Sequence, residues 1–285
     1  MEQIIESDLL GVRRVIDVPP EDAITMVAYG GGVNSTALLC GWIERGLRPV
    51  DVVIFSDTGG ERPETYRYVD TMSEWLVGKD YPPIVVVRAV NRVQAVKTLE
   101  DECLRHESLP SLAYGFKTCS LEFKNGPQVK WMNHWPPAQR AWKQRERIVK
   151  LIGYDADEPH RAGGGTREDA KYWYRYPLIE WGWGRLECVE AIQRAGLPVP
   201  PKSACFFCPA NTVTEIKDLQ RDHPDLLARA LAMEATAATK NTSVSGLGRR
   251  FSWRDLIHGK PLLLFDTEIA CECYDGGADL AAEDV

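Results

Sequence analysis

Long apolar runs are missing from this sequence of 285 residues. No run approaches the roughly 20 consecutive apolar residues that a membrane-spanning helix requires. The stretch from Met1 to Asp17 carries acidic side chains and lacks the apolar core of a secretory signal peptide. From these absences we expect a cytoplasmic protein with no membrane partner.

An excess of positive charge is also missing. The chain has 34 Lys and Arg against 41 Asp and Glu, which gives a formal net charge of −7. A protein that binds nucleic acid over its whole surface is usually basic, so binding of that kind is not expected. One stretch differs, because residues 117–150 hold eight Lys and Arg and only two acids, a local charge of +6.

The same basic stretch contains Trp131, Trp135 and Trp142. Indole rings stack on bases and cations pair with phosphates, so these residues would suit a strand of DNA. A solvated basic face with tryptophans buried beneath it fits the same residues, and the sequence leaves both interpretations open.

A lysine is missing from the glycine-rich turn at residues 30–32. Residues 24–29 are apolar or β-branched and predict a buried strand, residues 30–32 are glycines, and residues 34–46 predict a helix. Such a loop binds anions, because unpaired N–H groups and the helix dipole attract phosphate. With no lysine within residues 23–46 and no G-x-G-x-x-G spacing, neither a Walker loop nor a dinucleotide fingerprint is present. A plain glycine turn is the alternative.

Strand and helix patterns alternate along the first part of the chain. This alternation implies right-handed crossovers and a parallel sheet with helices on both faces. The predicted strands are residues 24–29, 50–55, 84–87 and 147–153, and the predicted helices are 63–77 and 92–104. We therefore expect an α/β, Rossmann-like fold with the glycine loop and Asp57-Thr58-Gly59 on one rim of the sheet.

Three regions follow from these patterns. A lead-in covers residues 1–22, a nucleotide-binding α/β domain covers 23–200, and a cysteine-containing helical region with an acidic tail covers 201–285. Within the third region, residues 211–240 predict two helices that break near Asp222-His223-Pro224. Residues 107–147 give a poor signal for either helix or strand.

The chain contains eight cysteines, and cytoplasmic proteins rarely use cysteines as a disulfide scaffold. Cys205 and Cys208 have the C-x-x-C spacing at which two thiolates can hold one metal ion or one corner of a cluster. Cys119, with either Cys271 or Cys273, would complete a set of four. A pair of buried apolar cysteines is the alternative.

Cys119 is the cysteine with the most basic surroundings in the sequence. Lys117 and Lys124 are close to it along the chain, and nearby cations favour the reactive thiolate. We expect Cys119 either to ligate a cluster or to carry a persulfide. Cys40 and Cys188 fall on predicted helices and are expected to be structural.

The glycine loop resembles the PP-loop, Ser-Gly-Gly-x-Asp-Ser, of the ATP pyrophosphatase and PAPS-reductase-like family. Gly30 replaces the family serine and Asn34 the family aspartate, whereas Gly31, Gly32 and Ser35 match. Two further segments are similar to that family. They are Asp57-Thr58-Gly59 followed by Pro63-Glu64-Thr65, and the stretch from Gly153 to Arg161, which is similar to Gly-Ile-x-x-x-Glu-x-x-Arg.

This resemblance implies ATP and Mg²⁺ as ligands, and either a 4Fe-4S iron-sulfur cluster or Zn²⁺ at the cysteines. The implied nucleotide-binding residues are Tyr29, Gly30, Gly31, Gly32, Asn34, Ser35, Thr36, Asp57, Thr58 and Gly59. The implied catalytic residues are Ser35, Asp57, Cys119 and Arg161, and the implied metal ligands are Cys119, Cys205, Cys208 and Cys273.

The segment from Lys117 to Lys124 is similar to the Cys-x-x-x-Lys region of PAPS-reductase-like proteins. The segment from Lys202 to Pro209 is similar to the DndC and SspD proteins of DNA phosphorothioation. The resemblance implies an ATP pyrophosphatase that adenylylates an acceptor, most plainly the DNA backbone, for sulfur incorporation. Its partners would be a cysteine desulfurase, DNA and other modification subunits. The alternatives are a phosphoadenosine or adenosine phosphosulfate reductase and a non-catalytic nucleotide-binding subunit.

Overall fold

The computed structural model of the protein describes residues 3–7, 13–17, 20–90, 95, 97–162, 170–240 and 243–260. At its centre is a sheet of five parallel strands in the order β5-β4-β3-β6-β7. The strands are β3 (Thr25–Tyr29), β4 (Val52–Asp57), β5 (Ile84–Arg88), β6 (Ile148–Ile152) and β7 (Tyr172–Arg175). This confirms the expected α/β, Rossmann-like fold.

Strands β3 and β6 are neighbours in the sheet although β4 and β5 lie between them in the chain. In their parallel register Thr25 pairs with Val149 and Ala28 with Ile152. The chain moves outward from β3 to β5 and then returns to the other side of β3. At such a reversal the loops after the two central strands diverge and leave a crevice, which is where ligands of these sheets bind.

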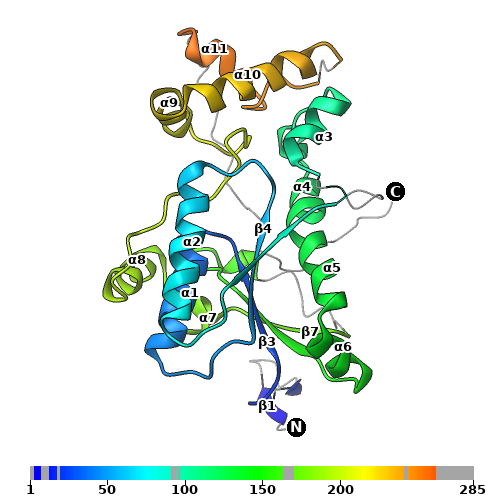
Figure 1. The fold of residues 1–285 in the computed structure, drawn as a ribbon, viewed down its shortest axis with the longest axis vertical. Coiled ribbons are helices and arrows are strands. Elements are labelled where there is room, and N and C mark those ends of the chain that lie inside the picture. The colour runs from blue at the N-terminus through cyan, green and yellow to red at the C-terminus, as the bar shows by residue number, and fades with distance from the viewer. Residues whose placement is uncertain are drawn as a thin grey trace.

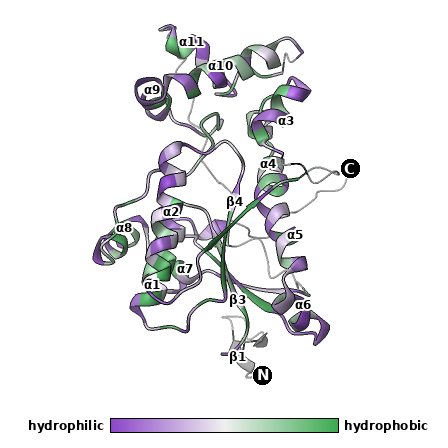
Figure 2. Ribbon diagram, in the orientation of Figure 1, coloured by the Kyte–Doolittle hydropathy of each residue, from purple (hydrophilic) through white to green (hydrophobic). Residues whose placement is uncertain are grey.

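Helices cover both faces of the sheet (Figure 1). Alternate strand residues point to opposite faces. Val27 therefore packs into the core beneath α1 and α2, and its neighbour Met26 packs beneath α5 and α6. Figure 2 shows the central strands in hydrophobic colours and the flanking helices in both colours. The helices on the first face are α1 (Val33–Glu44), α2 (Pro63–Val77), α7 (Pro177–Glu180) and α8 (Arg185–Arg194), and those on the second are α5 (Gly126–His134) and α6 (Pro136–Lys143).

The poorly predicted stretch, residues 107–147, is mostly helical. It contains η1 (Ser111–Tyr114), α4 (Thr118–Ser120), the π-helical turn η2 (Leu121–Asn125), α5 and α6. Trp135 takes an extended conformation that ends α5 and begins α6, with Pro136 in the first turn of α6. Helices this short, broken at a proline, do not show the 3.6-residue period that identifies a helix in a sequence.

Three other elements differ from the sequence prediction. β7 was not predicted. α3 (Leu99–His106) begins later than residue 92, because Thr98 caps it by accepting a hydrogen bond from the Asp101 N–H at 3.0 Å. Residues 91–94, where the predicted helix started, lie outside the described residues. The expected lead-in contains an antiparallel pair, β1 (Gln3–Ser7) and β2 (Arg13–Asp17).

The C-terminal helices lie beyond the carboxyl ends of the strands, at the top of Figure 1. They are α9 (Val213–Asp222), α10 (Pro224–Ala238) and α11 (Trp253–Ile257), and the break between the first two is where the sequence predicted it. Arg229 of α10 bonds Glu100 of α3, with Nε 2.9 Å from Oε1. Within the described residues, no helix has both the length and the apolar character needed to cross a membrane.

Glu234 of α10 organises the end of this region. Its carboxylate is 5% exposed and accepts hydrogen bonds from the N–H groups of Leu247 (2.8 Å), Trp253 (2.9 Å) and Arg254 (3.0 Å) and from the Ser252 hydroxyl (2.8 Å). Buried backbone N–H groups need such partners. One carboxylate therefore holds the loop before α11, and the start of α11, against α10.

We predict that Glu234→Ala lowers the free energy of unfolding by about 3 kcal/mol, because it leaves buried donors without an acceptor. Glu234→Gln keeps one acceptor oxygen and should cost less. Urea denaturation of both variants measures the effect, with the exposed Glu190→Ala as the control. An unchanged midpoint for Glu234→Ala would contradict this role.

Candidate functional site

The glycine loop lies at the carboxyl end of β3, as the sequence predicted. Gly31 has φ +75, a conformation that other residues rarely adopt, and Gly32 is the N-cap of α1. The Ser35 hydroxyl accepts a hydrogen bond from the Gly30 N–H at 3.1 Å and donates to the Gly32 carbonyl at 3.2 Å. Ser35 thus closes the loop, and the first N–H groups of α1 face its opening.

Two predicted ligand residues lie beneath the loop. The Tyr29 hydroxyl and the Thr36 hydroxyl are 3.0 Å apart, and both side chains are buried. Burial raises the pKa of the Tyr29 phenol, which therefore stays neutral. This pair supports the loop from inside the core.

The loop after β6 touches the start of α1. A Cβ on Gly153 would lie 2.8 Å from the Ser35 nitrogen and 2.9 Å from the Ser35 Cα, so only glycine allows this approach. Two residues later, Asp155 Oδ2 accepts a hydrogen bond from Asn34 Nδ2 at 2.8 Å. Arg185, at the start of α8, reaches Asn34 Oδ1 with Nη1 at 3.4 Å. An Asn–Asp hydrogen bond therefore joins the loop after β6 to the start of α1.

Asp155 is 4% exposed, and burial raises the pKa of its carboxyl group above the ordinary value. The hydrogen bond from Asn34 opposes this rise only in part. An aspartate at position 34, as in the PP-loop pattern, would place two carboxylates in contact. Asn34 is therefore the residue that Asp155 requires.

Asp57 ends β4 with both carboxylate oxygens in use. Oδ1 accepts from the Tyr66 hydroxyl at 2.7 Å and from the Gly59 N–H at 2.8 Å, and Oδ2 accepts from Arg88 Nε at 2.7 Å. The Asp57 side chain is 1% exposed. Asp57 would have to give up one of these hydrogen bonds before its carboxylate could bind a cation or a ribose hydroxyl.

Thr58 faces the cysteine loop, residues 203–209, and Gly59 faces the start of α3. The Thr58 hydroxyl is 3.1 Å from Cys205 Sγ. A Cβ on Gly59 would lie 2.5 Å from Thr98 Cγ2, and Gly59 has φ +76. The turn after β4 is thus packed between the cysteine loop and the start of α3.

The cysteine loop is bonded to both predicted nucleotide loops. The Phe206 N–H donates to the Gly60 carbonyl at 2.7 Å, and Cys205 forms an antiparallel bridge with Glu61. The Ser203 hydroxyl donates to the Gly30 carbonyl at 2.5 Å. A segment far along the sequence therefore lies directly on the carboxyl edge of β3 and β4.

A thiol pocket opens beside the cysteine loop. Mostly apolar side chains surround its thiols and lysines. Its lining includes Cys119, Cys205, Cys208, Lys117 and Lys124. The sequence predicted that Cys119 joins the C-x-x-C pair, and the fold does bring all three thiols to one cavity.

Lys124 links this pocket to the glycine loop. A second, smaller cavity, with an empty volume of about 260 Å³, is lined by Gly30, Ser56, Glu61 and Lys124. Lys124 belongs to the π-helical turn η2, and its carbonyl accepts a hydrogen bond from the Ser56 hydroxyl at 2.7 Å. π-Helical turns often occur at functional sites.

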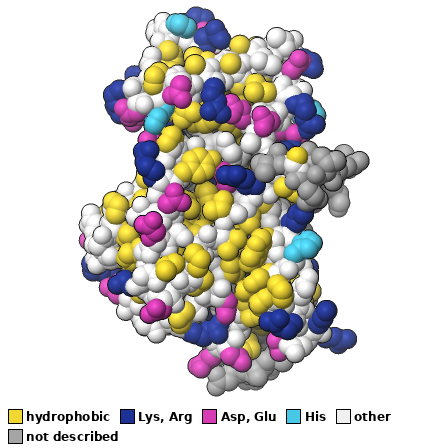
Figure 3. All heavy atoms as spheres, viewed as in Figure 1, with side chains coloured by type: hydrophobic (Ala, Val, Ile, Leu, Met, Phe, Trp, Pro, Cys, Tyr) yellow, Lys and Arg dark blue, Asp and Glu magenta, His cyan; other side chains and the backbone are white. Residues whose placement is uncertain are grey.

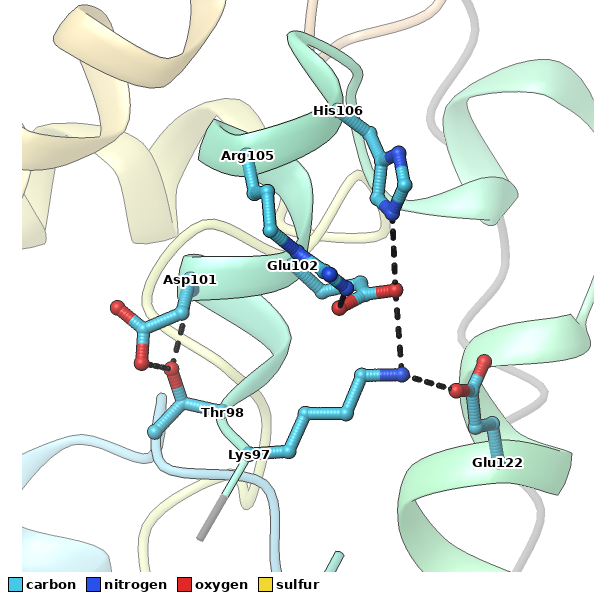
Figure 4. Close-up of polar contacts among 7 residues, drawn as sticks. All are labelled: Lys97, Thr98, Asp101, Glu102, Arg105, His106 and Glu122. Atoms are coloured by element: carbon cyan, nitrogen blue, oxygen red, sulfur yellow. Dashed lines mark hydrogen bonds and ion pairs between the residues drawn. The ribbon is translucent and has the colours of Figure 1, made fainter. Parts of the chain in front are cut away.

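Figure 4 shows how this turn is held to α3. Lys97 Nζ pairs with Glu122 of η2 and lies 3.1 Å from Glu102 of α3. Glu102 also bonds His106 at 3.1 Å. The network therefore fixes η2, and with it Lys124, against α3.

The three thiols are soft donors of the kind that zinc and iron-sulfur clusters use. Burial raises the pKa of the Cys205 thiol, the charge of Glu61 raises it further, and Lys124 and Thr58 lower it. Among the described residues, no three His, Cys, Asp or Glu side chains are close enough together to hold a metal ion. Cys271 and Cys273 lie outside the described residues, so the predicted four-ligand set stays a prediction.

Arg161 lies apart from the thiol pocket, after β6. It bonds Glu158 at 2.7 Å and stacks 4.2 Å from the centre of the Tyr154 ring. Tyr154 in turn stacks on Tyr176 with centroids 5.6 Å apart. These contacts make Arg161 part of an aromatic stack. They do not test its predicted catalytic role, which stays a prediction.

The remaining cysteines are buried. Cys40 and Cys188 are 3% and 0% exposed in the core beneath α1 and α8, in line with their predicted structural role. Cys103 is 4% exposed and packs in the same cluster as Cys119. Sequence reasoning gave Cys103 no role.

The tryptophans of the basic stretch pack largely against the protein. Trp131 stacks on Trp135 at 5.6 Å, and Trp142 meets the edge of Tyr172 at 5.8 Å. All three are half-buried against the core beneath α5 and α6. Figure 3 shows hydrophobic side chains exposed along the middle of this face, beside these helices. Because the rings are half-buried, their packing does not decide between a basic face over buried tryptophans and a surface for DNA.

Sequence reasoning did not find Ser203, Asp155 or Lys124 as residues of the nucleotide edge. Gly153 carried a signal, since a glycine directly after a buried strand often marks a close backbone approach. The other three lie in segments that resemble the family, but the resemblance did not assign them to this edge, because each meets the glycine loop or its cavity only through tertiary contacts.

Comparison with solved structures finds similar folds. A phosphoadenylyl-sulfate (PAPS) reductase from Candida auris, in a phosphate complex, has 17% identity and a TM-score of 0.40 over 64% of this chain and 80% of its own. The U34-tRNA thiolase NcsA from Methanococcus maripaludis, with its 4Fe-4S cluster, has 14% identity and a TM-score of 0.43 over 79% of this chain and 76% of its own. No protein family and no curated protein matches the sequence. The likeness is one of fold alone.

We predict that Asn34→Asp lowers the free energy of unfolding at pH 7 by about 2 kcal/mol, because a second carboxylate would then face the buried carboxylate of Asp155. The double variant Asn34→Asp/Asp155→Asn exchanges the two groups and should recover most of the loss. Chemical denaturation of the single and double variants tests this. Equal losses in both would show that the pair does not interact.

The raised pKa of Asp155 predicts a pH dependence. A buried acid with a raised pKa stabilises the fold in its protonated form, and this contribution is lost as the pH rises through that pKa. Asp155→Asn cannot ionise, so its stability relative to wild type should increase between pH 3 and pH 7. Paired denaturation curves at several pH values measure the difference. A constant difference would contradict the assignment.

Proposed function

We propose that this protein is an ATP pyrophosphatase of sulfur transfer that acts on DNA. An acceptor oxygen of the DNA backbone attacks the α phosphorus of ATP, pyrophosphate leaves, and the acceptor carries AMP. A persulfide on Cys119 then attacks the activated phosphorus, and AMP leaves. A second thiol of the pocket attacks the resulting S–S bond, which releases the phosphorothioate and leaves a protein disulfide for an external thiol to reduce. A cysteine desulfurase is the proposed sulfur donor.

The observation that carries this proposal is the contact between the glycine loop and the cysteine loop. Ser203 of the cysteine loop donates to the carbonyl of Gly30 at 2.5 Å. Lys124 lines both the cavity at Gly30 and the thiol pocket. A phosphate-binding loop and three thiols on one edge suit a reaction in which nucleotide cleavage prepares the attack of sulfur.

Phosphate binding is assigned to the N–H groups of Gly31, Gly32 and Ser35, at the N-terminus of α1. Lys124 lies one cavity away and offers positive charge to the polyphosphate. Phosphoryl transfer depends mainly on positioning and on neutralising charge, and these groups would contribute both to the first step, together with Mg²⁺ bound to ATP.

Sulfur handling is assigned to Cys119, Cys205 and Cys208. Apolar walls surround these thiols, and a dry pocket protects an activated intermediate from hydrolysis. Cys119 is half-buried, which leaves it accessible to a donor protein. Because these three thiols are not close enough together to hold a metal ion, the proposed sulfur step uses the thiols themselves and no metal.

DNA binding is assigned to the basic stretch. Lys130, Arg140 and Lys143 are exposed on α5 and α6. Pairing with phosphates would come from these cations, and such binding weakens as the salt concentration rises. Because the whole chain has a net charge of −7, partner subunits would contribute to DNA binding.

We predict that Cys119→Ser retains ATP binding and pyrophosphate release but loses sulfur transfer, because the glycine loop is unchanged. The assay combines protein, Mg-ATP, DNA, a cysteine desulfurase and radiolabelled cysteine, and measures pyrophosphate and label in DNA. Ser35→Ala should reduce pyrophosphate release about 100-fold, since the loop amides lose their alignment.

Cys188→Ser is the control for loss of a buried thiol, since Cys188 lies in the other core, and it should behave as wild type. Normal labelling by Cys119→Ser would remove Cys119 from the mechanism. Absence of label with the wild-type protein, despite ATP cleavage, would contradict DNA as the acceptor.

A further inference from the structure

The peptide between Gly30 and Gly31 is held at its carbonyl by Ser203, and the preceding peptide is held at the Gly30 N–H by Ser35. The Gly30 N–H, on the preceding peptide, donates to Ser35 Oγ at 3.1 Å, and the Gly30 carbonyl accepts from the Ser203 hydroxyl at 2.5 Å. Ser35 belongs to the loop's own helix, whereas Ser203 belongs to the cysteine loop. The orientation of this peptide therefore depends on a residue outside the glycine loop.

Ser203 has one hydroxyl hydrogen and two acceptors within reach. The Gly30 carbonyl is 2.5 Å away and Glu61 Oε2 is 3.4 Å away, so the hydrogen serves Gly30. Ser203 is also near the rest of the loop, because a Cβ on Gly31 would lie 3.5 Å from its Oγ and a Cβ on Gly32 would lie 3.7 Å from its Cβ.

The direction of the Gly30 carbonyl decides the direction of the next N–H group. No described peptide bond is cis, and in a trans peptide the C=O and the following N–H point in opposite directions. With the Gly30 carbonyl turned to Ser203, the Gly31 N–H points away from the cysteine loop. A peptide between two glycines rotates easily, since neither residue has a Cβ to restrict it.

We propose that Ser203 is a positioning residue that fixes the Gly30–Gly31 peptide and so couples the phosphate site to the thiol loop. This inference rests on the phosphate-binding role of the glycine loop proposed above. The Gly30 position lacks the side-chain hydroxyl that the PP-loop pattern carries there, and Ser203 brings a hydroxyl to the same peptide from the cysteine loop.

Coupling of this kind is reciprocal. A phosphate bound by the Gly31 N–H favours the peptide orientation that Ser203 holds, and this tightens the bond to the cysteine loop. Cys208, five residues after Ser203, is half-buried at the thiol pocket. The accessibility of its thiol therefore measures how firmly the cysteine loop is held. Occupation of the phosphate site should therefore lower the accessibility of Cys208.

The test measures the rate at which iodoacetamide alkylates Cys208, by mass spectrometry of the full chain's peptides, with and without pyrophosphate and magnesium chloride. In the wild type, pyrophosphate should slow alkylation about fivefold, the lower end of usual coupling. In Ser203→Ala this protection should disappear and pyrophosphate should bind about fivefold more weakly. Ser203→Thr keeps the hydroxyl and should restore both.

Ser73→Ala is the matched control, because Ser73 Oγ accepts a hydrogen bond from the Ile84 N–H far from the loop, and it should keep full protection. Unchanged affinity and protection in Ser203→Ala would overturn the inference. So would a wild type that binds no pyrophosphate. A wild type that shows the coupling but does not cleave ATP would support the inference and contradict the pyrophosphatase function alone.

Discussion

The contact on which the site depends is the docking of the cysteine loop on the carboxyl edge of β3 and β4. Two backbone carbonyls at that edge, those of Gly30 and Gly60, are satisfied by Ser203 and by the Phe206 N–H. A Cβ on Gly60 would lie 2.7 Å from the Phe207 ring, so the loop lies directly on the turn after β4. Because buried backbone groups need partners, this docking is part of the fold itself and not a loose appendage.

The same docking explains why the C-terminal helices matter to the site. The cysteine loop leads into α9, and Phe206 and Phe207 belong to the core that α3, α9 and α10 share. The Arg229–Glu100 pair and the contact of His223 with Glu64, at 2.8 Å, join this core to α3 and α2. Loss of packing among these helices would therefore displace the thiols before it disturbed the parallel sheet.

Departures from the PP-loop pattern have structural reasons. Asn34 faces the buried carboxylate of Asp155, and a second acid there would be repelled. Gly30 lacks a hydroxyl where Ser203 provides one. Asp57, by contrast, matches the pattern but is fully bonded to Tyr66, Gly59 and Arg88. A match or a mismatch with a motif therefore does not by itself reveal what a residue contacts.

The sequence alone determined the parallel α/β sheet, the glycine loop, α2 at its observed bounds and the break before Pro224, because local periodicity and turn residues carry that information. It also indicated that Cys119 shares a site with Cys205 and Cys208. It did not indicate β7, an edge strand, or α5 and α6, whose period is broken at Trp135-Pro136. Only the tertiary structure decided that Ser203, Lys124 and Asp155 meet the glycine loop or its cavity, since contacts between distant segments leave no periodic trace in the chain.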